Sequence, residues 1–313
     1  MSKRAKSGPR IAFQGEHGAF SEAAAIRLFG ESISTVPRAT FDSAFRAIQE
    51  GAADALLAPV ENSLAGSVVR VYDLLLESNL GIVAETILPI EHHLIACPGA
   101  TLAELKSVAS HPMALAQCER FFLSHPHLKR VPAEDTAGSV RDMLASGDKS
   151  RAAIAGRRAA TRYGGVILTE SIQDNAENFT RFLLLTPVER GEAAGPRNSA
   201  VAASPAVTDL MMELSLRRAE ESSVQPTQKL SLALRLAHKP GALLSALEPF
   251  ARHGMNLLKI ESRPIHGSPW EYQFFLDVQT DAPAQLEAVM KELGATTSFL
   301  RVLGIYPPAR SDP

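Results

Sequence analysis

The residues best suited to chemistry lie in the stretch 173–185, which reads QDNAENFTRFLLL. A polar, turn-forming run ends there in a short apolar strand, and Thr180, Arg181 and Phe182 sit at the junction beside Phe179. An arginine can hold a carboxylate through two parallel hydrogen bonds, and a hydroxyl can donate to a departing oxygen. The combination predicts a pocket for a small, partly apolar anion. The alternative is a surface turn that leads into a core strand.

The elements that position this stretch recur along the first half of the chain as strand, polar loop and helix. Residues 10–14 read as a buried strand, a loop with Gly15 and Gly18 follows, and Ser21 is placed to cap a helix. Residues 54–60 repeat the pattern, with the polar run 61–67 and a helix over 68–78. Helix-start amides favour anions, and ligands bind at the carboxyl ends of strands in such sheets. We therefore predict an α/β fold with a cleft lined by hydrogen-bond donors.

Bulk properties exclude several classes of function. A chain of 313 residues suggests two domains, and the formal net charge of -2 gives no electrostatic footprint for nucleic acid. No apolar run is long enough to span a bilayer and the N-terminus lacks a secretory apolar segment, so we expect a cytoplasmic protein without a membrane partner.

Motifs for metals and cofactors are missing from the sequence. Cys97 and Cys118 have neither redox nor metal spacing and are expected as reduced core residues. The pair His92 and His93 lacks a third ligand at a supporting spacing, although one of the two imidazoles is a candidate to reach the cleft. Nucleotide-binding glycine patterns, zinc-helix motifs and a nucleophile elbow are also absent. We expect chemistry without a cofactor or metal, or no chemistry.

The order of the motifs resembles that of the prephenate dehydratases, with the plant arogenate dehydratases as close relatives. The matching strings are GEHGAFS (15–21), PVENSLAGSV (59–68), SHPMALAQC (110–118), DTA (135–137), AAIA (152–155) and NFTRF (178–182). They cover about the first 185 residues. Two departures are Met113, where the family usually has Gln, and the loop QGEHG, which is closer to the arogenate type.

The resemblance implies two α/β lobes around a cleft, similar to type II periplasmic binding proteins. It places a tail at 1–9 and the catalytic part at 10–187, with lobe 1 at about 10–90 and 175–187 and lobe 2 at about 91–174. A linker follows at 188–227, in which Val207, Leu210, Met211 and Leu214 predict a short amphipathic helix.

The segment 228–306 predicts a second domain, before a short tail at 307–313. Its order of strands and helices, βαββαβ, is ferredoxin-like, and the strings GALL (241–244) and ESRP (261–264) look like those of an ACT domain. In the dehydratases such strings help form a phenylalanine site between paired ACT domains. The residues expected there are Gly241, Ala242, Leu243, Leu244, Asn256, Leu257, Glu261, Ser262, Arg263 and Pro264. Paired ACT domains imply a homodimer or homotetramer, with L-phenylalanine as effector.

The predicted reaction is the decarboxylating dehydration of prephenate to phenylpyruvate in phenylalanine biosynthesis. The predicted catalytic residues are Thr180 at the leaving hydroxyl, Arg181 at a carboxylate or bracing the fold, and Phe182 as an apolar wall. The other expected substrate-binding residues are Asn62, Ser63, Gly66, Ser21, Thr136 and Asn178. Glu61 is either a loop brace or a base, and His17 and His111 are weaker candidates as cleft donors. The alternatives are an arogenate dehydratase that forms phenylalanine directly and a non-catalytic amino-acid sensor.

Overall fold

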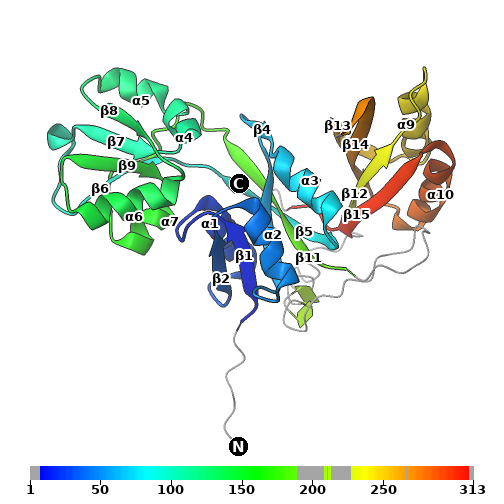
Figure 1. Ribbon diagram of the computed structural model, residues 1–313, viewed down its shortest axis with the longest axis horizontal. Helices are drawn as coiled ribbons and strands as arrows, with labels where there is room; N and C mark the ends of the chain where they lie inside the picture. The colour runs from blue at the N-terminus through cyan, green and yellow to red at the C-terminus, as the bar shows by residue number, and fades with distance from the viewer. Residues whose placement is uncertain (1–7, 189–207, 210, 213–226, 266, 310–313) are drawn as a thin grey trace, which may run out of the picture. The chain divides into compact units, whose positions relative to one another are not determined.

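The computed structural model of the chain describes residues 8–188, 208–209, 211–212, 227–265 and 267–309 (Figure 1). The chain divides into two compact units, Met1–Leu74 with Thr86–Phe182 and Leu75–Glu85 with Leu183–Pro313. The amphipathic helix expected over 207–214 lies largely outside the described residues.

The first sheet has the strand order β2-β1-β3-β11-β5, and β4 pairs with β3. Its strands are β1 (Arg10–Gln14), β2 (Ser34–Arg38), β3 (Ala55–Asn62), β4 (Gly66–Ser67), β5 (Leu80–Pro89) and β11 (Phe179–Pro187). Three helices alternate with these strands along the chain: α1 (Phe20–Phe29), α2 (Phe41–Gln49) and α3 (Val69–Glu77). Because β11 is inserted beside β3, the chain returns to the first sheet after building the second lobe. Through this pairing the chain re-enters the first sheet at Phe179, close to the return that the sequence analysis placed near residue 175.

The second sheet has the order β10-β6-β9-β7-β8. Its strands are β6 (His93–Ala96), β7 (Ser107–Ser110), β8 (Lys129–Pro132), β9 (Arg151–Ala155) and β10 (Val166–Thr169). The helices α4 (Pro112–Ala116) and α5 (Glu119–Ser124) cover one face, and α6 (Thr136–Ser146) and α7 (Arg157–Tyr163) cover the other (Figure 1). Cys97 and Cys118 are both free and buried, as expected.

Two helix boundaries differ from the sequence expectations. The sequence after Pro112 predicts one helix over 113–122, but this helix is broken between α4 and α5 because the carboxylate of Asp174 accepts the backbone N–H groups of Glu119 and Arg120, each at 2.9 Å. A carboxylate at a helix start stabilises those amides. A second helix, α5, therefore begins at Glu119, and Gln117 lies between the two helices. Helix α1 begins at Phe20 with Ala19 at the cap position, so Ser21 is a buried helical residue rather than the cap.

The ferredoxin-like domain predicted after residue 228 is confirmed. Its elements are β12 (Gln228–Arg235), α9 (Ala242–Arg252), β13 (Asn256–Ile265), β14 (Ser268–Thr280), α10 (Leu286–Thr296) and β15 (Phe299–Tyr306). The sheet order is β13-β14-β12-β15, and both helices lie on one face of it (Figure 1). Alternate leucines of β12 point into the core under these helices because side chains alternate across a strand.

A buried ion pair joins β12 to β5 within the second unit. Lys229 Nζ donates to Glu85 Oε1 at 2.6 Å, and the backbone N–H of Ala309 donates to the same oxygen at 2.8 Å. Arg301 of β15 donates to the carbonyl oxygens of Leu76 at 2.7 Å and Ser78 at 2.9 Å. Because a buried charge without its partner is strongly destabilising, these contacts fix β5 to the ferredoxin-like domain.

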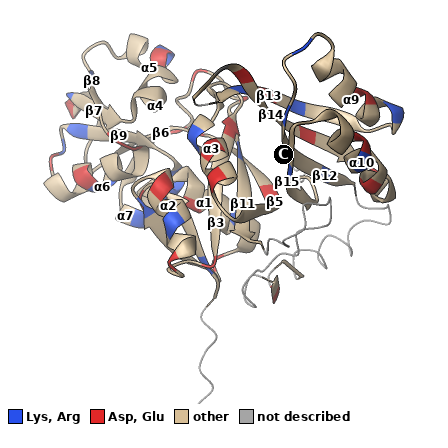
Figure 2. Cartoon of the chain, turned by 45° about the vertical axis from the view of Figure 1, so that its right-hand side comes forward, with Lys and Arg blue, Asp and Glu red and all other residues tan. Residues whose placement is uncertain are grey.

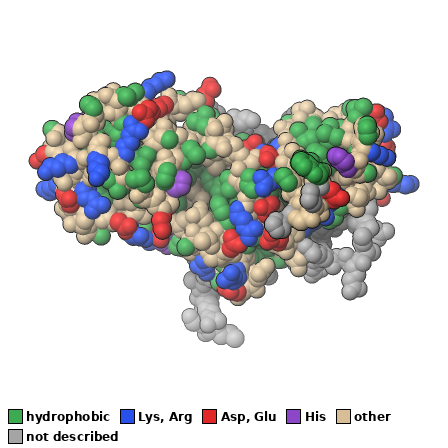
Figure 3. Space-filling model, turned by 45° about the horizontal axis from the view of Figure 1, so that its top comes forward, with side chains coloured by type: hydrophobic (Ala, Val, Ile, Leu, Met, Phe, Trp, Pro, Cys, Tyr) green, Lys and Arg blue, Asp and Glu red, His purple; other side chains and the backbone are tan. Residues whose placement is uncertain are grey.

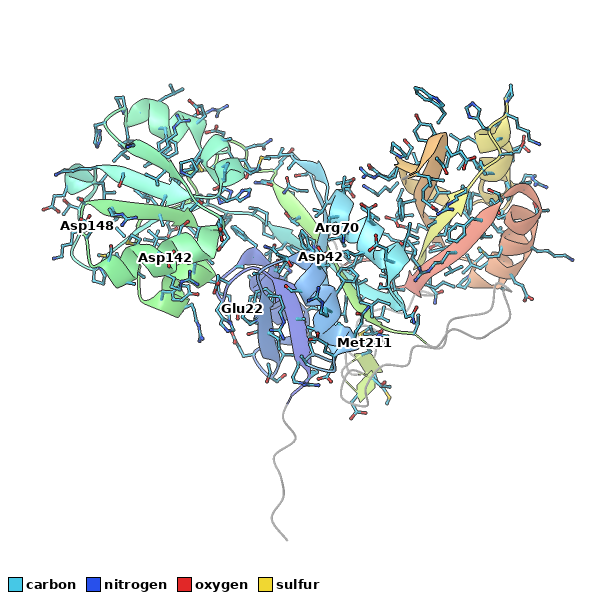
Figure 4. All side chains as sticks on the ribbon, in the orientation of Figure 1. Glu22, Asp42, Arg70, Asp142, Asp148 and Met211 are labelled. Carbon is cyan, nitrogen blue, oxygen red and sulfur yellow. The ribbon has the colours of Figure 1, made fainter. Side chains whose placement is uncertain are left out.

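The surface carries both charges without a large field of either sign in the views shown. Lysine, arginine, aspartate and glutamate are interspersed over the elements (Figure 2) and among hydrophobic side chains on the face in Figure 3. Asp42 of α2 and Arg70 of α3 form one such exposed pair (Figure 4). Within the described residues, no helix is both long and apolar enough to cross a membrane.

Candidate functional site

The candidate site forms where the end of β3 meets the segment that leads into β11. The Ser63 backbone N–H donates to the Phe179 carbonyl at 2.9 Å, and the Phe179 N–H donates to Ser63 Oγ at 3.0 Å. Ser63 Oγ in turn donates to the carbonyl of Glu177 at 2.9 Å. The predicted ligand Ser63 therefore uses its hydroxyl to fix the backbone on either side of Asn178.

Asn62 holds the hydroxyl of Thr180. Asn62 Nδ2 donates to Thr180 Oγ1 at 2.9 Å and to Asn178 Oδ1 at 2.7 Å, while the Phe179 carbonyl lies 3.1 Å away. Thr180 is only 9% exposed, and Asn178 is buried as well. The structure thus brings together Asn62, Asn178 and Thr180, three residues that the sequence assigned to the site.

Gln117 is a further member of this cluster that the sequence analysis missed. Its Oε1 accepts from Asn178 Nδ2 at 3.1 Å and lies 2.9 Å from His92 Nε2. The string SHPMALAQC could have indicated this position. Gln117 is the polar residue at the end of a helix that starts at the carboxyl end of a strand, where ligands bind in such sheets. The expectation of an unbroken helix hid this position. His92 is the imidazole of the His92–His93 pair that reaches the cluster.

Strand geometry places Arg181 on the opposite face of β11 from Thr180, whereas Phe182 shares the buried face with Thr180. Neighbouring residues on a strand point to opposite faces, and Arg181 Nη1 lies 3.9 Å from Glu61 Oε2. This pairing favours the bracing role that the sequence left open for both residues. Phe182 is 1% exposed and lies in the core, whereas Phe179 is 41% exposed. Phe179 is therefore the more exposed of the two aromatic side chains, and it points to the opposite face of β11 from Thr180.

The remaining predicted residues lie elsewhere in the first unit. Ser21 is buried in α1, Gly66 is in β4 with φ +80°, and Thr136 is the first residue of α6, whose cap is Asp135. In the described part of the chain, no hydrogen bond joins these three to Thr180. Of the weaker candidates, His111 caps α4 by accepting the Met113 N–H at 3.2 Å, and Met113 itself is exposed.

The loop that contains Gly15 and Gly18 contacts the second lobe instead of forming an open anion cradle. A Cβ on Gly18 would lie 2.8 Å from Cα of Ala159, and one on Gly156 would lie 2.8 Å from the Phe20 ring. Gly18 also has φ +88°, which favours glycine. These two glycines let α1 and α7 approach closely, so the string GEHGAFS forms a seam between the lobes.

Glu22 is the charged centre of this seam (Figure 4). Its carboxylate accepts from the Gly18 N–H at 2.7 Å, from Thr35 Oγ1 at 2.7 Å and from Arg158 Nε of α7 at 3.0 Å, and it lies 2.8 Å from His17 Nδ1. Burial by itself raises the pKa of Glu22, but the hydrogen bonds from His17, Gly18, Thr35 and Arg158 outweigh it and lower the pKa to about 2. Glu22 therefore ties the lobes together as a carboxylate.

The Thr180 cluster itself is uncharged. Burial lowers the pKa of His92 below its ordinary value, which favours the neutral imidazole. Burial raises the pKa of the nearby Cys118 thiol to about 12, so this thiol stays protonated. Within the described residues, no group of three histidine, cysteine, aspartate or glutamate side chains is arranged to hold a metal ion. The cluster presents an oriented hydroxyl and amides, which suit hydrogen bonding to an oxygen-rich substrate.

The predicted effector residues occupy two segments of the ferredoxin-like domain. Gly241 has φ +78° and caps α9, and Leu244 in the first turn is 65% exposed. The other residues, Asn256, Leu257, Glu261, Ser262, Arg263 and Pro264, all lie on β13. Because β13 is an edge strand of its sheet, this surface is open to a ligand or to another chain.

Comparisons with known proteins agree with this architecture. The family description "Prephenate dehydratase" matches residues 11–190, and "ACT domain" matches residues 231–295. The chain is 35% identical to arogenate dehydratase/prephenate dehydratase 2 of Arabidopsis thaliana, a chloroplastic protein, over 95% of this chain and 72% of that protein.

Two solved structures are similar over almost the whole chain. A prephenate dehydratase from Arthrobacter aurescens in complex with L-Phe has a TM-score of 0.76 and 29% identity, over 97% of this chain and 90% of that one. GqqA, described as a novel type of quorum quenching acylase, has a TM-score of 0.78 and 31% identity, over 96% of this chain and 98% of that one.

The pKa of Glu22 predicts a pH-dependent contribution to stability. Because the folded pKa of about 2 lies below the ordinary 4.5, the contribution is present above pH 4.5 and is lost as the pH falls towards 2. We expect Glu22→Gln to lower the free energy of unfolding by about 3 kcal/mol at pH 7 and by progressively less below pH 4.5. Urea unfolding at a series of pH values measures the difference. The matched control is Glu31→Gln, an exposed partner of the same Arg158, and a cost for Glu22→Gln that is constant down to pH 3 would contradict the assignment.

Proposed function

Because the chain belongs to the prephenate dehydratase family, which is a family of lyases, we propose that it removes carbon dioxide and hydroxide from prephenate to form phenylpyruvate, a step of phenylalanine biosynthesis. The observation that carries this proposal is the bond from Asn62 Nδ2 to Thr180 Oγ1 at 2.9 Å. An amide N–H cannot accept a proton, so the Thr180 oxygen is the acceptor and its own proton is left for another group.

Loss of carbon dioxide and hydroxide makes the ring of prephenate aromatic, so the driving force is intrinsic to the substrate. The protein has to orient the substrate and assist departure of the oxygen, and positioned acid–base assistance contributes about 10²–10⁴-fold. The Thr180 hydroxyl donates to the departing oxygen. Phe182, which lies on the same face of β11 as Thr180, stays the predicted apolar wall. Ser63, Gly66, Ser21 and Thr136 stay predictions for substrate binding, and Arg181 is proposed to act through Glu61 on the fold of the site.

Arogenate is the alternative substrate, because one of the similar proteins is named for both activities. The two substrates differ in one group, a carbonyl against an ammonium. The Thr180 cluster is assigned to the ring hydroxyl, which both substrates share. Turnover measured on each substrate therefore decides between them.

The geometry supports amide hydrolysis less well, despite the likeness to GqqA. A hydroxyl nucleophile needs a base that accepts its proton. Thr180 Oγ1 instead accepts a hydrogen bond from an amide that cannot take up a proton. This arrangement suits a hydrogen-bond donor and not an activated nucleophile.

We further propose that the chain forms a homodimer or homotetramer through its ACT domain and that L-phenylalanine binds there as effector. The apolar side chains Leu258 and Ile260 on the edge strand β13, and Trp270 and Tyr272 on β14, are exposed. An apolar strand edge of this kind favours pairing with a second copy. A cytoplasmic location stays a prediction.

Thr180 gives the direct test of the catalytic proposal. We expect Thr180→Ala to lower kcat for phenylpyruvate formation from prephenate by about 10²–10⁴-fold, because the departing oxygen loses its donor. Thr180→Ser keeps the hydroxyl and should stay within about tenfold of the parent. The control is Thr161→Ala, an exposed threonine on α7. Near-normal turnover by a folded Thr180→Ala protein would show that the role assigned to Thr180 is wrong. Parallel assays of the parent chain with arogenate decide which of the two substrates it prefers.

The effector proposal predicts a coupled effect on stability and activity. Saturating L-phenylalanine, at about 100 times its Kd, should stabilise the folded protein by about 2.7 kcal/mol and lower its turnover of prephenate. Leu244→Lys places a charge in the predicted site and should abolish both effects, while Leu123→Lys, at an equally exposed leucine of α5, should leave them intact. Thermal unfolding with and without L-phenylalanine measures the first effect. An undiminished shift in Leu244→Lys would place the effector elsewhere.

A further inference from the structure

His92 lies in the segment that joins the lobes, and its surroundings fix the position of its ring. Its backbone N–H donates to Gln173 Oε1 at 2.9 Å, and its carbonyl accepts from the Ile172 N–H at 2.8 Å. The Phe20 ring packs edge-on against the imidazole at 5.6 Å between centroids. The residue is 2% exposed. An imidazole held in this way by backbone and ring contacts offers its partners one orientation only.

A series of hydrogen bonds connects Thr180 to His92, and the amide of Asn62 determines which group donates and which accepts in each of them. The backbone N–H groups of Leu64 and Ala65 donate to Asn62 Oδ1 at 3.0 and 2.8 Å, which fixes the orientation of the Asn62 amide. Asn62 Nδ2 must then donate, so the atom of Asn178 that it meets is the oxygen. The other amide atom of Asn178 is consequently a donor to Gln117 Oε1. Each amide orientation is therefore set by the one before it.

The same reasoning fixes the tautomer of His92. Gln117 Oε1 can only accept, so His92 Nε2, at 2.9 Å, carries a proton. His92 Nδ1 is buried and has no hydrogen-bond partner in the described part of the chain. A proton on Nδ1 would leave a buried donor unpaired, so the neutral imidazole protonated at Nε2 fits the site.

The bond from His92 reinforces the orientation of the Gln117 carboxamide. Two donors, from His92 and Asn178, converge on Gln117 Oε1. Gln117 itself is partly exposed at the break between α4 and α5. Without the His92 donor, Gln117 Oε1 keeps the bond from Asn178 alone, and the carboxamide is held less firmly.

We propose that His92 is a positioning residue for the reaction at Thr180, an inference that rests on the proposed function. The N–H at Nε2 is a second donor to Gln117 Oε1, which holds this carboxamide in place and, through Asn178, supports the Asn62 amide that makes Thr180 a donor towards the substrate. The links between His92 and Thr180 are amides, which donate hydrogen bonds but do not pass protons on at neutral pH. His92 therefore orients the donors of the site and is not the source of the proton for the departing hydroxide.

The test compares two substitutions with different hydrogen-bonding ability. His92→Phe keeps an aromatic ring against Phe20 but has no N–H, and we expect kcat for prephenate to fall about tenfold to a hundredfold because Gln117 Oε1 loses a buried donor. His92→Gln can place an amide N–H near the position of Nε2 and should recover most of that loss. In a Gln117→Ala background, His92→Phe should lower kcat by less than about threefold further, because residues that act through one another are not additive.

The outcomes separate this inference from the proposed function. No turnover of prephenate by the parent chain means that the proposed function is wrong. An active parent with an equally active His92→Phe variant contradicts the positioning role, and so does a folded His92→Gln variant that is as impaired as His92→Phe. A readout independent of activity is the nitrogen NMR spectrum of histidine-labelled protein at pH 7. We expect a neutral His92 protonated at Nε2, and a ring protonated at Nδ1 would overturn the inference.

Discussion

The site depends on the orientation of one amide, that of Asn62. The backbone turn after β3 points the N–H groups of Leu64 and Ala65 at Asn62 Oδ1, and this leaves Asn62 Nδ2 as a donor towards Thr180 and Asn178. A threonine hydroxyl is a very weak acid and a rotating one, so its usefulness depends on where its proton points. Because Asn62 occupies the Thr180 oxygen as a donor, the hydroxyl proton has to point elsewhere. Among the residues that the structure describes, the side chain that bonds to this hydroxyl is the uncharged amide of Asn62.

The two lobes supply different parts of the cluster, and the seam between them keeps those parts in register. Asn62 comes from the first sheet, Gln117 from the second lobe, and Asn178 and His92 from the connecting segments. Glu22 and Arg158 link α1 to α7 across the seam, where two glycines permit close backbone contact. A hydrogen bond of about 3 Å tolerates little displacement. Movement of one lobe against the other would therefore break the link between Gln117 and Asn178 before it disturbed the core of either lobe.

The sequence predicted the architecture well because its motifs lie where strands end. Alternating strands and helices and the ferredoxin-like order after residue 228 follow from local patterns, whereas Asn62, Asn178 and Thr180, which the structure brings together, came from motifs of the resemblance. The sequence analysis did not predict Gln117 as a site residue, because its position depends on Asp174. This residue is distant in sequence and breaks the helix after Gln117. The role of Phe182 as an apolar wall stays a prediction: it shares the buried face of β11 with Thr180 and is 1% exposed. For the glycine loop at 15–18 the sequence left an anion site and a plain turn open, because close packing and ligand binding both select glycine.

The most direct measurement of the central claim is the turnover of Asn62→Asp compared with Asn62→Ala. Aspartate has the shape of asparagine but places a second acceptor where Asn62 Nδ2 now donates, so it would draw the Thr180 proton away from the substrate and face the oxygen of Asn178. The account predicts that Asn62→Asp forms phenylpyruvate no faster than Asn62→Ala, with both about 10²-fold or more below the parent. Substantial activity in Asn62→Asp, well above that of Asn62→Ala, would contradict the account, because Thr180 would then work with a neighbouring base.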